Sequence, residues 1–307
     1  MIVYHFLDRY GYINFGVQPD RVDEDSGEKE TSPMVLVVGA GASGLAASMQ
    51  LTKFGVRVTI VEGRERTGGR VFSPLLVGSN STSCHLNLGQ SWTTGTQGNP
   101  LHLICLQNDI PTFSIPDDSP LYSCHGGVLH HQIRQDVEHQ FYSLLDLLVE
   151  KRGELLGKNK SQDISLRQSL DSLQGQAIRY PSRDTPSQEQ IFQSFQAALH
   201  WHEMSFEMEL GAALDTISFR CWEAEEDFAP EGGIWYPCGG FSQVIHALES
   251  FLLHGAAAKK HQTILNSPVQ SVTLHDNVVV RTTRGEEIKG DAILLSVPLG
   301  VLKQQYV

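Results

Sequence analysis

The most constraining feature of this chain is a glycine-rich turn between a predicted buried strand and a predicted helix. An apolar run, Met34–Val38, is typical of a buried strand, and the motif GAGASG at residues 39–44 follows it directly. Leu45–Phe54 is helix-like, and a second β-rich run, Val56–Val61, ends at Glu62. This order of strand, glycine turn, helix, strand and acid is typical of a βαβ unit that binds a dinucleotide.

Each glycine of the turn has its own expected role. Gly39 allows the tight turn out of the strand, Gly41 lets a pyrophosphate approach the backbone, and Gly44 lets helix and strand pack closely. Free N–H groups at the start of the helix would bind the phosphates. Glu62 lies about 20 residues further on, where an acid accepts hydrogen bonds from ribose hydroxyls. The alternative is a glycine-rich turn in an ordinary α/β domain.

Composition adds broad limits. A length of 307 residues with 40% hydrophobic residues suits a large core and two domains or subdomains. The net charge of −12 disfavours nonspecific DNA binding and suits a basic peptide or an amine better. The five cysteines form no C-x-x-C pair, so we expect reduced thiols and no structural zinc site. No signal peptide is evident, and no apolar run reaches about 18 residues, so no membrane span is predicted.

The residues that follow Glu62 resemble those of a known family. The pattern E-x-R-x-R-x-G-G-R at residues 62–70 resembles the FAD-binding signature of the flavin amine oxidases. A nicotinamide fold has no need for a second glycine pair and extra arginines there, so the resemblance implies FAD as the cofactor. It also implies the fold class, an α/β chain with an FAD-binding Rossmann-like βαβ domain and an incomplete α+β substrate domain. A solvated basic loop is the alternative.

Further blocks resemble one branch of that family, the lysine-specific histone demethylases. Residues 7–16 resemble the end of the SWIRM domain that precedes the oxidase domain in this branch. Residues 88–100 resemble its flavin- and substrate-side loop, and residues 297–305 resemble the end of its first FAD-side half. The segments 200–202 and 222–228 also align with it. The activity implied is oxidation of N-methyl-lysine with release of formaldehyde and peroxide, in the nucleus.

The resemblance assigns site residues by position. Those expected to bind FAD are Gly39, Gly41, Ser43, Gly44, Glu62, Arg64, Gly69, Arg70, Ser91, Trp92 and Val269. Those expected at the substrate cleft or its acidic rim are Thr94, Glu138, Glu223, Glu225, Glu226 and Asp227. A run of acids is equally often a solvated face. No metal ligand is expected, and no catalytic side chain is assigned, because the family's flavin-side lysine is expected beyond Val307.

Two other functions remain open. A polyamine oxidase shares the glycine and arginine motifs but lacks the SWIRM-like start, and a chromatin-binding remnant would have no catalysis. The expected partner is a basic histone-tail peptide or another amine substrate, with neither DNA nor a membrane. Residues 157–190 lack the long coiled coil that some relatives insert, so no corepressor bound through one is expected. We expect this chain to be an inactive part of an oxidase.

Sequence patterns divide the chain into five parts. These are a SWIRM-like remnant at 1–17, an acidic linker at 18–33, an FAD-binding part at 34–110, a mainly helical substrate-side part at 111–255, and an incomplete return to the FAD-binding part at 256–307. Periodicity predicts helices at 136–152, 166–173, 190–210 and 241–254 and strands at 218–222, 264–274, 278–281 and 291–297.

Overall fold

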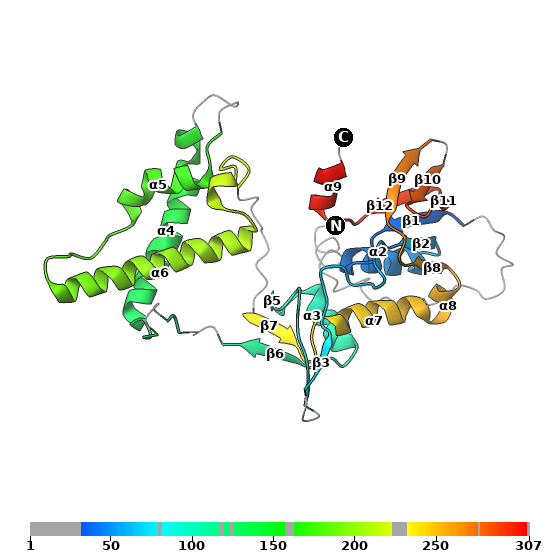
Figure 1. Cartoon of the computed structure of the whole chain (residues 1–307), viewed down its shortest axis with the longest axis horizontal. Helices are drawn as coiled ribbons and strands as arrows, with labels where there is room; N and C mark the ends of the chain where they lie inside the picture. The colour runs from blue at the N-terminus through cyan, green and yellow to red at the C-terminus, as the bar shows by residue number, and fades with distance from the viewer. Residues whose placement is uncertain are drawn as a thin grey trace, which may run out of the picture. The chain divides into compact units, whose positions relative to one another are not determined.

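The chain forms two compact units, shown in Figure 1. Unit 1 comprises Met1–Asp117 and Ala229–Val307, and unit 2 comprises Asp118–Phe228. The computed structural model describes residues 32–78, 82–116, 120–122, 126–156, 163–222, 232–275 and 277–305. The SWIRM-like remnant, most of the linker and the acids Glu223, Glu225, Glu226 and Asp227 lie outside the described residues.

A four-stranded parallel sheet forms the centre of unit 1. Its elements are β1 (Met34–Val38), α2 (Ala42–Lys53), β2 (Arg57–Val61), β8 (His261–Ile264) and β12 (Ala292–Leu295). The strand order is β12-β1-β2-β8, and β1 pairs in parallel with both β12 and β2. The predicted first strand and the predicted α/β class with a Rossmann-like βαβ unit are thereby confirmed. Because β12 and β2 flank β1 on opposite sides, the carboxyl edge of β1 is where such sheets bind ligands.

The parallel sheet is covered on both faces (Figure 1). The covering elements are α7 (Ser242–Leu253) with α2, and an antiparallel sheet of β9 (Val269–Leu274), β10 (Val278–Thr282) and β11 (Glu287–Gly290). Val37 packs in the cluster that holds α2 and α7, whereas Leu36 and Val38 pack with Val278 and Val280 of β10. This alternation of faces explains why the first strand is apolar throughout.

The remaining elements of unit 1 lie between or after these layers. They are β3 (Leu75–Val77) and β4 (Ser83–His85), which pair as a hairpin; β5 (Thr93–Thr94), β6 (Thr112–Ile115) and β7 (Ile234–Pro237), which form a small antiparallel sheet; and the helices α3 (Pro100–Gln107), α8 (Gly255–Ala258) and α9 (Leu299–Gln305). Among the described residues no helix is both long and apolar enough to cross a membrane.

Three sequence-based expectations differ from the structure. The single strand predicted at 264–274 is wrong, because Asn266 with φ 55° and the following Pro268 divide it into β8 and β9 of different sheets. The strand predicted at 218–222 is wrong, since this segment is a turn with one isolated bridge at Ser218. Helix α7 lies in unit 1, although the predicted boundary at residue 255 placed it in the substrate-side part, because its apolar face packs in the core against α2.

Unit 2 is built from helices around its own apolar core. They are α4 (His131–Leu156), α5 (Leu166–Ala177), α6 (Pro186–Leu210) and the short 3-10 helix η1 (Leu214–Thr216). Val137, Phe141, Leu144 and Leu148 of α4 are at most 3% exposed and follow the helical period. The helix predicted at 136–152 therefore lies within α4, and these residues form its buried face.

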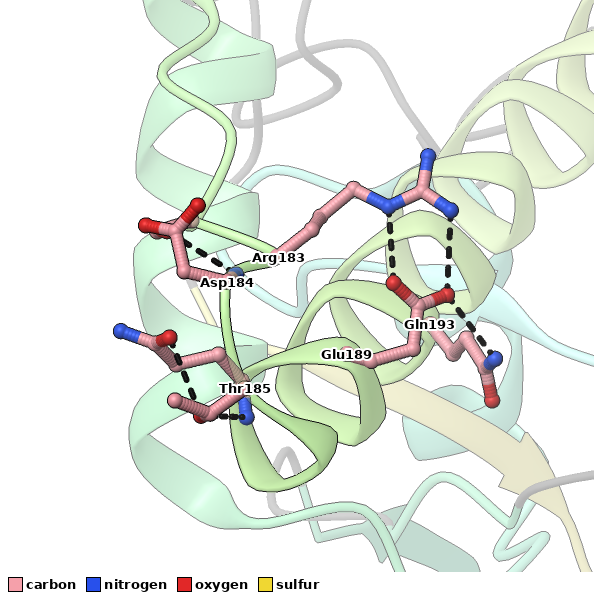
Figure 2. Close-up of polar contacts among 7 residues, drawn as sticks. Arg183, Asp184, Thr185, Glu189 and Gln193 are labelled. Carbon is pink, nitrogen blue, oxygen red and sulfur yellow. Dashed lines mark hydrogen bonds and ion pairs between the residues drawn. The ribbon is translucent and has the colours of Figure 1, made fainter.

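The start of α6 is fixed by local polar contacts, shown in Figure 2. Thr185 is the N-cap and accepts a hydrogen bond from the backbone N–H of Gln188, with Pro186 in the first helical turn. Arg183 donates two hydrogen bonds to Glu189, whose carboxylate also accepts one from Gln193. The helix therefore begins at residue 186, four residues before the predicted start, because the Thr-Pro pair provides an N-cap signal.

A buried histidine makes the stability of unit 2 sensitive to acid. His202 is 7% exposed, stacks on Phe141, and its Nε2 atom finds no hydrogen-bond partner among the described residues. Burial lowers its pKa in the folded state, and Glu138 partly opposes that shift. The stability that depends on a neutral His202 is therefore fully present above the unfolded pKa of about 6.5. It falls as the pH drops through that value toward the folded pKa.

We expect urea unfolding of unit 2, followed by tryptophan fluorescence, to give a lower midpoint at pH 5 than at pH 8. His202→Phe keeps an aromatic ring in the core and removes the titrating group, so the pH dependence should shrink in this variant. An equal pH dependence in both proteins would contradict the assignment to His202.

Candidate cofactor site at the carboxyl edge of the parallel sheet

Two glycines of the turn are required by the packing of the chain itself. Gly39 has φ 106°, a backbone conformation that residues other than glycine rarely adopt. Its N–H donates to the carbonyl of Val61 at the end of β2. A Cβ on Gly44 would lie 2.0 Å from the carbonyl oxygen of Gly39 and 2.8 Å from Oγ of Ser296. Glycine at 44 therefore allows the start of α2 to pack directly on the end of β1.

Gly41 is different, because nothing among the described residues requires a glycine there. Its backbone is extended, with φ −76° and ψ 178°, which any residue adopts. A Cβ on Gly41 would meet no described atom within 4 Å. Gly41 is the N-cap of α2, and Ser43 is exposed in the first turn of that helix. The backbone at 41–43 thus presents an open, positively polarised helix start to an approaching group.

Glu62 closes the other side of this edge. It follows β2 and is 8% exposed. Oε2 accepts a hydrogen bond of 2.7 Å from the backbone N–H of Ala40, and Oε1 accepts one of 2.8 Å from that of Arg64. These bonds fix the carboxylate beside the glycine turn. Each oxygen keeps a further lone pair, so the carboxylate can still accept bonds from vicinal hydroxyls.

The arginine-rich loop is held by its own side chains. Arg64 donates to the carbonyl of Gly69, and so does Arg66, at 2.8 and 3.0 Å. Arg66 also donates to the carbonyls of Thr67 and Val71. The N–H of Gly68 in turn donates to the carbonyl of Ala40. The loop is thereby tied to the glycine turn, with Gly69 beside Gly41.

Arg66 was not among the residues assigned from the sequence. It is partly buried and its guanidinium lies 4.2 Å from the centre of the Phe72 ring, a cation–π contact. The motif contained the residue, but only the structure shows that its donors are directed to backbone carbonyls. Arg66 therefore shapes the loop, whereas Arg70 is exposed and its side chain is free to face a ligand.

The predicted loop with Ser91 and Trp92 runs beside the arginine segment. The N–H of Gln90 donates to the carbonyl of Arg70 at 3.3 Å. A Cβ on Gly89 would lie 1.8 Å from that same carbonyl, so only glycine fits there. Ser91 donates to the carbonyl of Gly89, and Trp92 is 45% exposed. The exposed indole thus lies two residues after Gln90, whose backbone is bonded to Arg70.

Thr94 and Val269 lie in separate parts of unit 1. Thr94 ends β5 and pairs with Ile234 of β7. Val269 begins β9, directly after a segment in which the N–H of Ser267 donates to the carbonyl of Glu62. Val269 is therefore close in sequence to a segment bonded at the carboxyl end of β2, whereas Thr94 belongs to the small antiparallel sheet.

In unit 2 the structure adds acids and an aromatic side chain around Glu138. Glu138 and Tyr142 are both exposed and lie one turn apart on α4. The pKa of Tyr142 is raised, first because its side chain is partly buried and then because Glu209 on α6 and Glu138 carry negative charges. The sequence had suggested only Glu138 from this group. Among the described residues no set of three or more His, Cys, Asp or Glu side chains could hold a metal ion.

Comparisons with known proteins agree on one family. A family model described as flavin containing amine oxidoreductase matches residues 42–307. Lysine-specific histone demethylase 1 homolog 1 of Arabidopsis thaliana is 31% identical over 303 residues, which are 98% of this chain and 34% of that protein. Protein FLOWERING LOCUS D of the same plant is 32% identical over 300 residues, 98% of this chain and 35% of that protein.

More distant relatives show the same pattern. Lysine-specific histone demethylase 2 of Homo sapiens is 28% identical over 307 residues, 98% of this chain and 34% of that protein. A solved structure of a redesigned putrescine oxidase matches this chain with a TM-score of 0.58 at 19% identity. The match covers 89% of this chain and 60% of that chain, and it supports the fold alone. The chain spans about a third of the length of the curated relatives named here.

Proposed function

The chain belongs to the family of flavin-containing amine oxidoreductases, and from that membership we propose that it acts on N-methyl-lysine in a basic histone-tail peptide, in the nucleus. The curated relatives are histone demethylases by name and match almost the whole chain. The SWIRM-like residues 7–16, which lie outside the described residues, favour this branch over the polyamine oxidases.

The cofactor is FAD, as the sequence predicted. The observation that supports its binding at this edge is Gly41, where neither backbone conformation nor packing calls for a glycine. We propose that the helix start at 41–43 holds the diphosphate, Glu62 accepts the ribose hydroxyls, and Arg70 with Trp92 contacts the remainder. When bound, FAD supplies the oxidising power for removing hydride from an amine.

The residues of the chain would bind, orient and shield the reactants. The loops around Gly69 and Gly89 would hold the cofactor, and Val269 would add a backbone group beside its adenine. Thr94 borders the substrate cleft. No acid–base side chain of this chain is assigned to the reaction.

The acids support a cationic substrate. Glu138 and Glu209 act together on the exposed Tyr142, and an aromatic ring flanked by carboxylates suits an ammonium or guanidinium group. The net charge of −12 would favour the approach of a basic peptide. Glu223, Glu225, Glu226 and Asp227, all outside the described residues, would extend this acidic rim.

We expect Glu138→Lys combined with Glu209→Lys to weaken binding of a Lys- and Arg-rich peptide about tenfold, mainly through slower association. Asp171→Lys combined with Glu150→Lys is the matched control for a double reversal, because both are exposed acids of the same unit, on α5 and α4. Association and dissociation rates are measured at low and high salt. An equal loss from the control would show that net charge alone matters and would contradict a role for Glu138 and Glu209.

Measurements of turnover distinguish the possible substrate classes. Peroxide release should be faster with a methyl-lysine peptide than with spermine. Faster oxidation of spermine would favour a polyamine oxidase, and binding of the peptide without any peroxide would favour a chromatin-binding remnant.

A further inference from the structure

Three separate segments of unit 1 meet through two serines and an asparagine. The N–H of Ser73 donates to Oγ of Ser242 at 2.7 Å, and the N–H of Ser242 donates to Oγ of Ser73 at 3.2 Å. Oγ of Ser73 also donates to Oδ1 of Asn87 at 2.6 Å. Oδ1 of Asn87 further accepts a longer bond, of 3.4 Å, from the N–H of Phe241. These residues are partly or fully buried, and we call them the serine–asparagine junction.

The junction caps α7 from outside its own sequence. Ser242 is the first residue of α7, and the N-cap residue, Phe241, makes no side-chain capping bond. Ser73 supplies the missing acceptor, as an N-cap serine would. Gly240 has φ 86°, and a Cβ there would lie 2.6 Å from Cβ of Ser73, so the close approach of the two segments requires glycine. The start of α7 is therefore held by hydrogen bonds and close packing with the segments that contain Ser73 and Asn87.

The junction lies directly beside both loops assigned to FAD. Segment 86–90 runs antiparallel to segment 70–74: the N–H of Leu86 donates to Pro74, that of Leu88 to Phe72, and that of Gln90 to Arg70. Asn87 lies between Leu86 and Leu88 on one segment. Ser73 lies on the other segment, between the two residues whose carbonyls accept these bonds. Movement at the junction would therefore be passed to Arg70 on one segment and to Ser91 and Trp92 on the other.

Helix α7 gives this assembly a fixed base. Its apolar face lies in the core cluster that also holds residues of the parallel sheet and α2. Ile245, one turn after Ser242, lies 3.5 Å from where a Cβ on Gly68 would be. The start of α7 thus contacts the arginine-rich loop at Gly68 and, through Ser242, at Ser73.

We propose that Ser73, Asn87 and Ser242 are positioning residues that hold the Arg70 segment and the Ser91–Trp92 loop in the geometry that binds FAD. The inference rests on the proposed function. The glycine turn and Glu62 are held by other bonds, namely those to Val61, Ala40 and Arg64. Loss of the junction should therefore weaken binding of FAD and spare binding of ADP, for which the turn and Glu62 suffice.

The test measures the Kd of FAD by flavin fluorescence, the Kd of ADP by calorimetry, and the melting temperature. Ser242→Ala removes the acceptor for Ser73 and should raise the Kd of FAD about tenfold, whereas Ser242→Thr keeps the hydroxyl and should restore it. Ser169→Ala, which deletes a buried hydroxyl hydrogen-bonded within α5 of unit 2, is the matched control and should leave both Kd values unchanged.

A second pair of variants keeps the test decisive if Ser242→Ala fails to fold. Asn87 acts only as an acceptor in the junction, so Asn87→Asp should bind FAD as the unaltered chain does, and Asn87→Leu should bind it about tenfold more weakly. Unchanged FAD affinity in Ser242→Ala or Asn87→Leu, or a parallel loss of ADP and FAD affinity, would overturn the positioning role. Failure of the unaltered chain to bind FAD would instead overturn the proposed cofactor site.

Discussion

Gly41→Ala should lower the affinity for FAD and for ADP about a hundredfold while the chain keeps its fold. The backbone at Gly41 is extended, and the added Cβ would meet no described atom, so neither strain nor a clash within the chain is expected. The methyl group would instead occupy the space through which a diphosphate approaches the N–H groups of α2. A loss of binding without a loss of stability is the signature of a residue selected for a ligand.

Calorimetric titrations with ADP and FAD measure this effect, and thermal unfolding reports on the fold. Gly175→Ala is the matched control, because it adds the same methyl group on α5 of unit 2, where a Cβ also meets no described atom. Unchanged affinity of Gly41→Ala for both nucleotides would show that the open space at residue 41 has no part in binding.

Gly44→Ala should have the opposite profile, a large loss of stability. A Cβ at this position would lie 2.0 Å from the carbonyl oxygen of Gly39, which belongs to the backbone and cannot move without displacing the turn or α2. Overpacking of this kind typically costs about 1–3 kcal/mol and sometimes more, out of a total stability of about 5–15 kcal/mol. We expect the variant to unfold at markedly lower urea concentration or to be recovered only as aggregate.

Urea unfolding of unit 1, followed by circular dichroism, gives the comparison with Gly41→Ala. Equal midpoints for the two variants would contradict the different roles of the two glycines. The contrast is sharp because the two positions are separated by less than one helical turn and receive the same substitution.

Much of the first βαβ unit could be predicted, because its sequence signals are local. The apolar run 34–38 is a strand buried on both faces, and the glycine spacing fixes where the turn begins. The structure adds a distinction that the motif alone does not show. Gly44 is needed for packing and Gly39 for its backbone angle, whereas Gly41 faces open space.

Two features of unit 1 were predicted wrongly from the sequence. The segment 264–274 contains the turn-forming residues Asn266 and Pro268, and the strand prediction overlooked this local signal for a break between two sheets. The whole of unit 2 lies between α2 and α7 in the sequence, so the place of α7 in the core of unit 1 follows only from packing.

The candidate site was likewise predicted only in part from the sequence. The motif identified Glu62 and the arginines. It did not show that Arg66 donates its hydrogen bonds to backbone carbonyls. Glu209 was missed because its partner Tyr142 lies on another helix. The roles of all these residues toward FAD and substrate remain proposals.

Titration of the purified chain with FAD, ADP and NADH is the most direct test of the cofactor site at the carboxyl edge of β1. We predict saturable binding of FAD that ADP displaces, displacement by NADH no stronger than that by ADP, and loss of FAD and ADP binding in Gly41→Ala. Binding of NADH in preference to FAD, or FAD binding that survives in Gly41→Ala, would contradict the account.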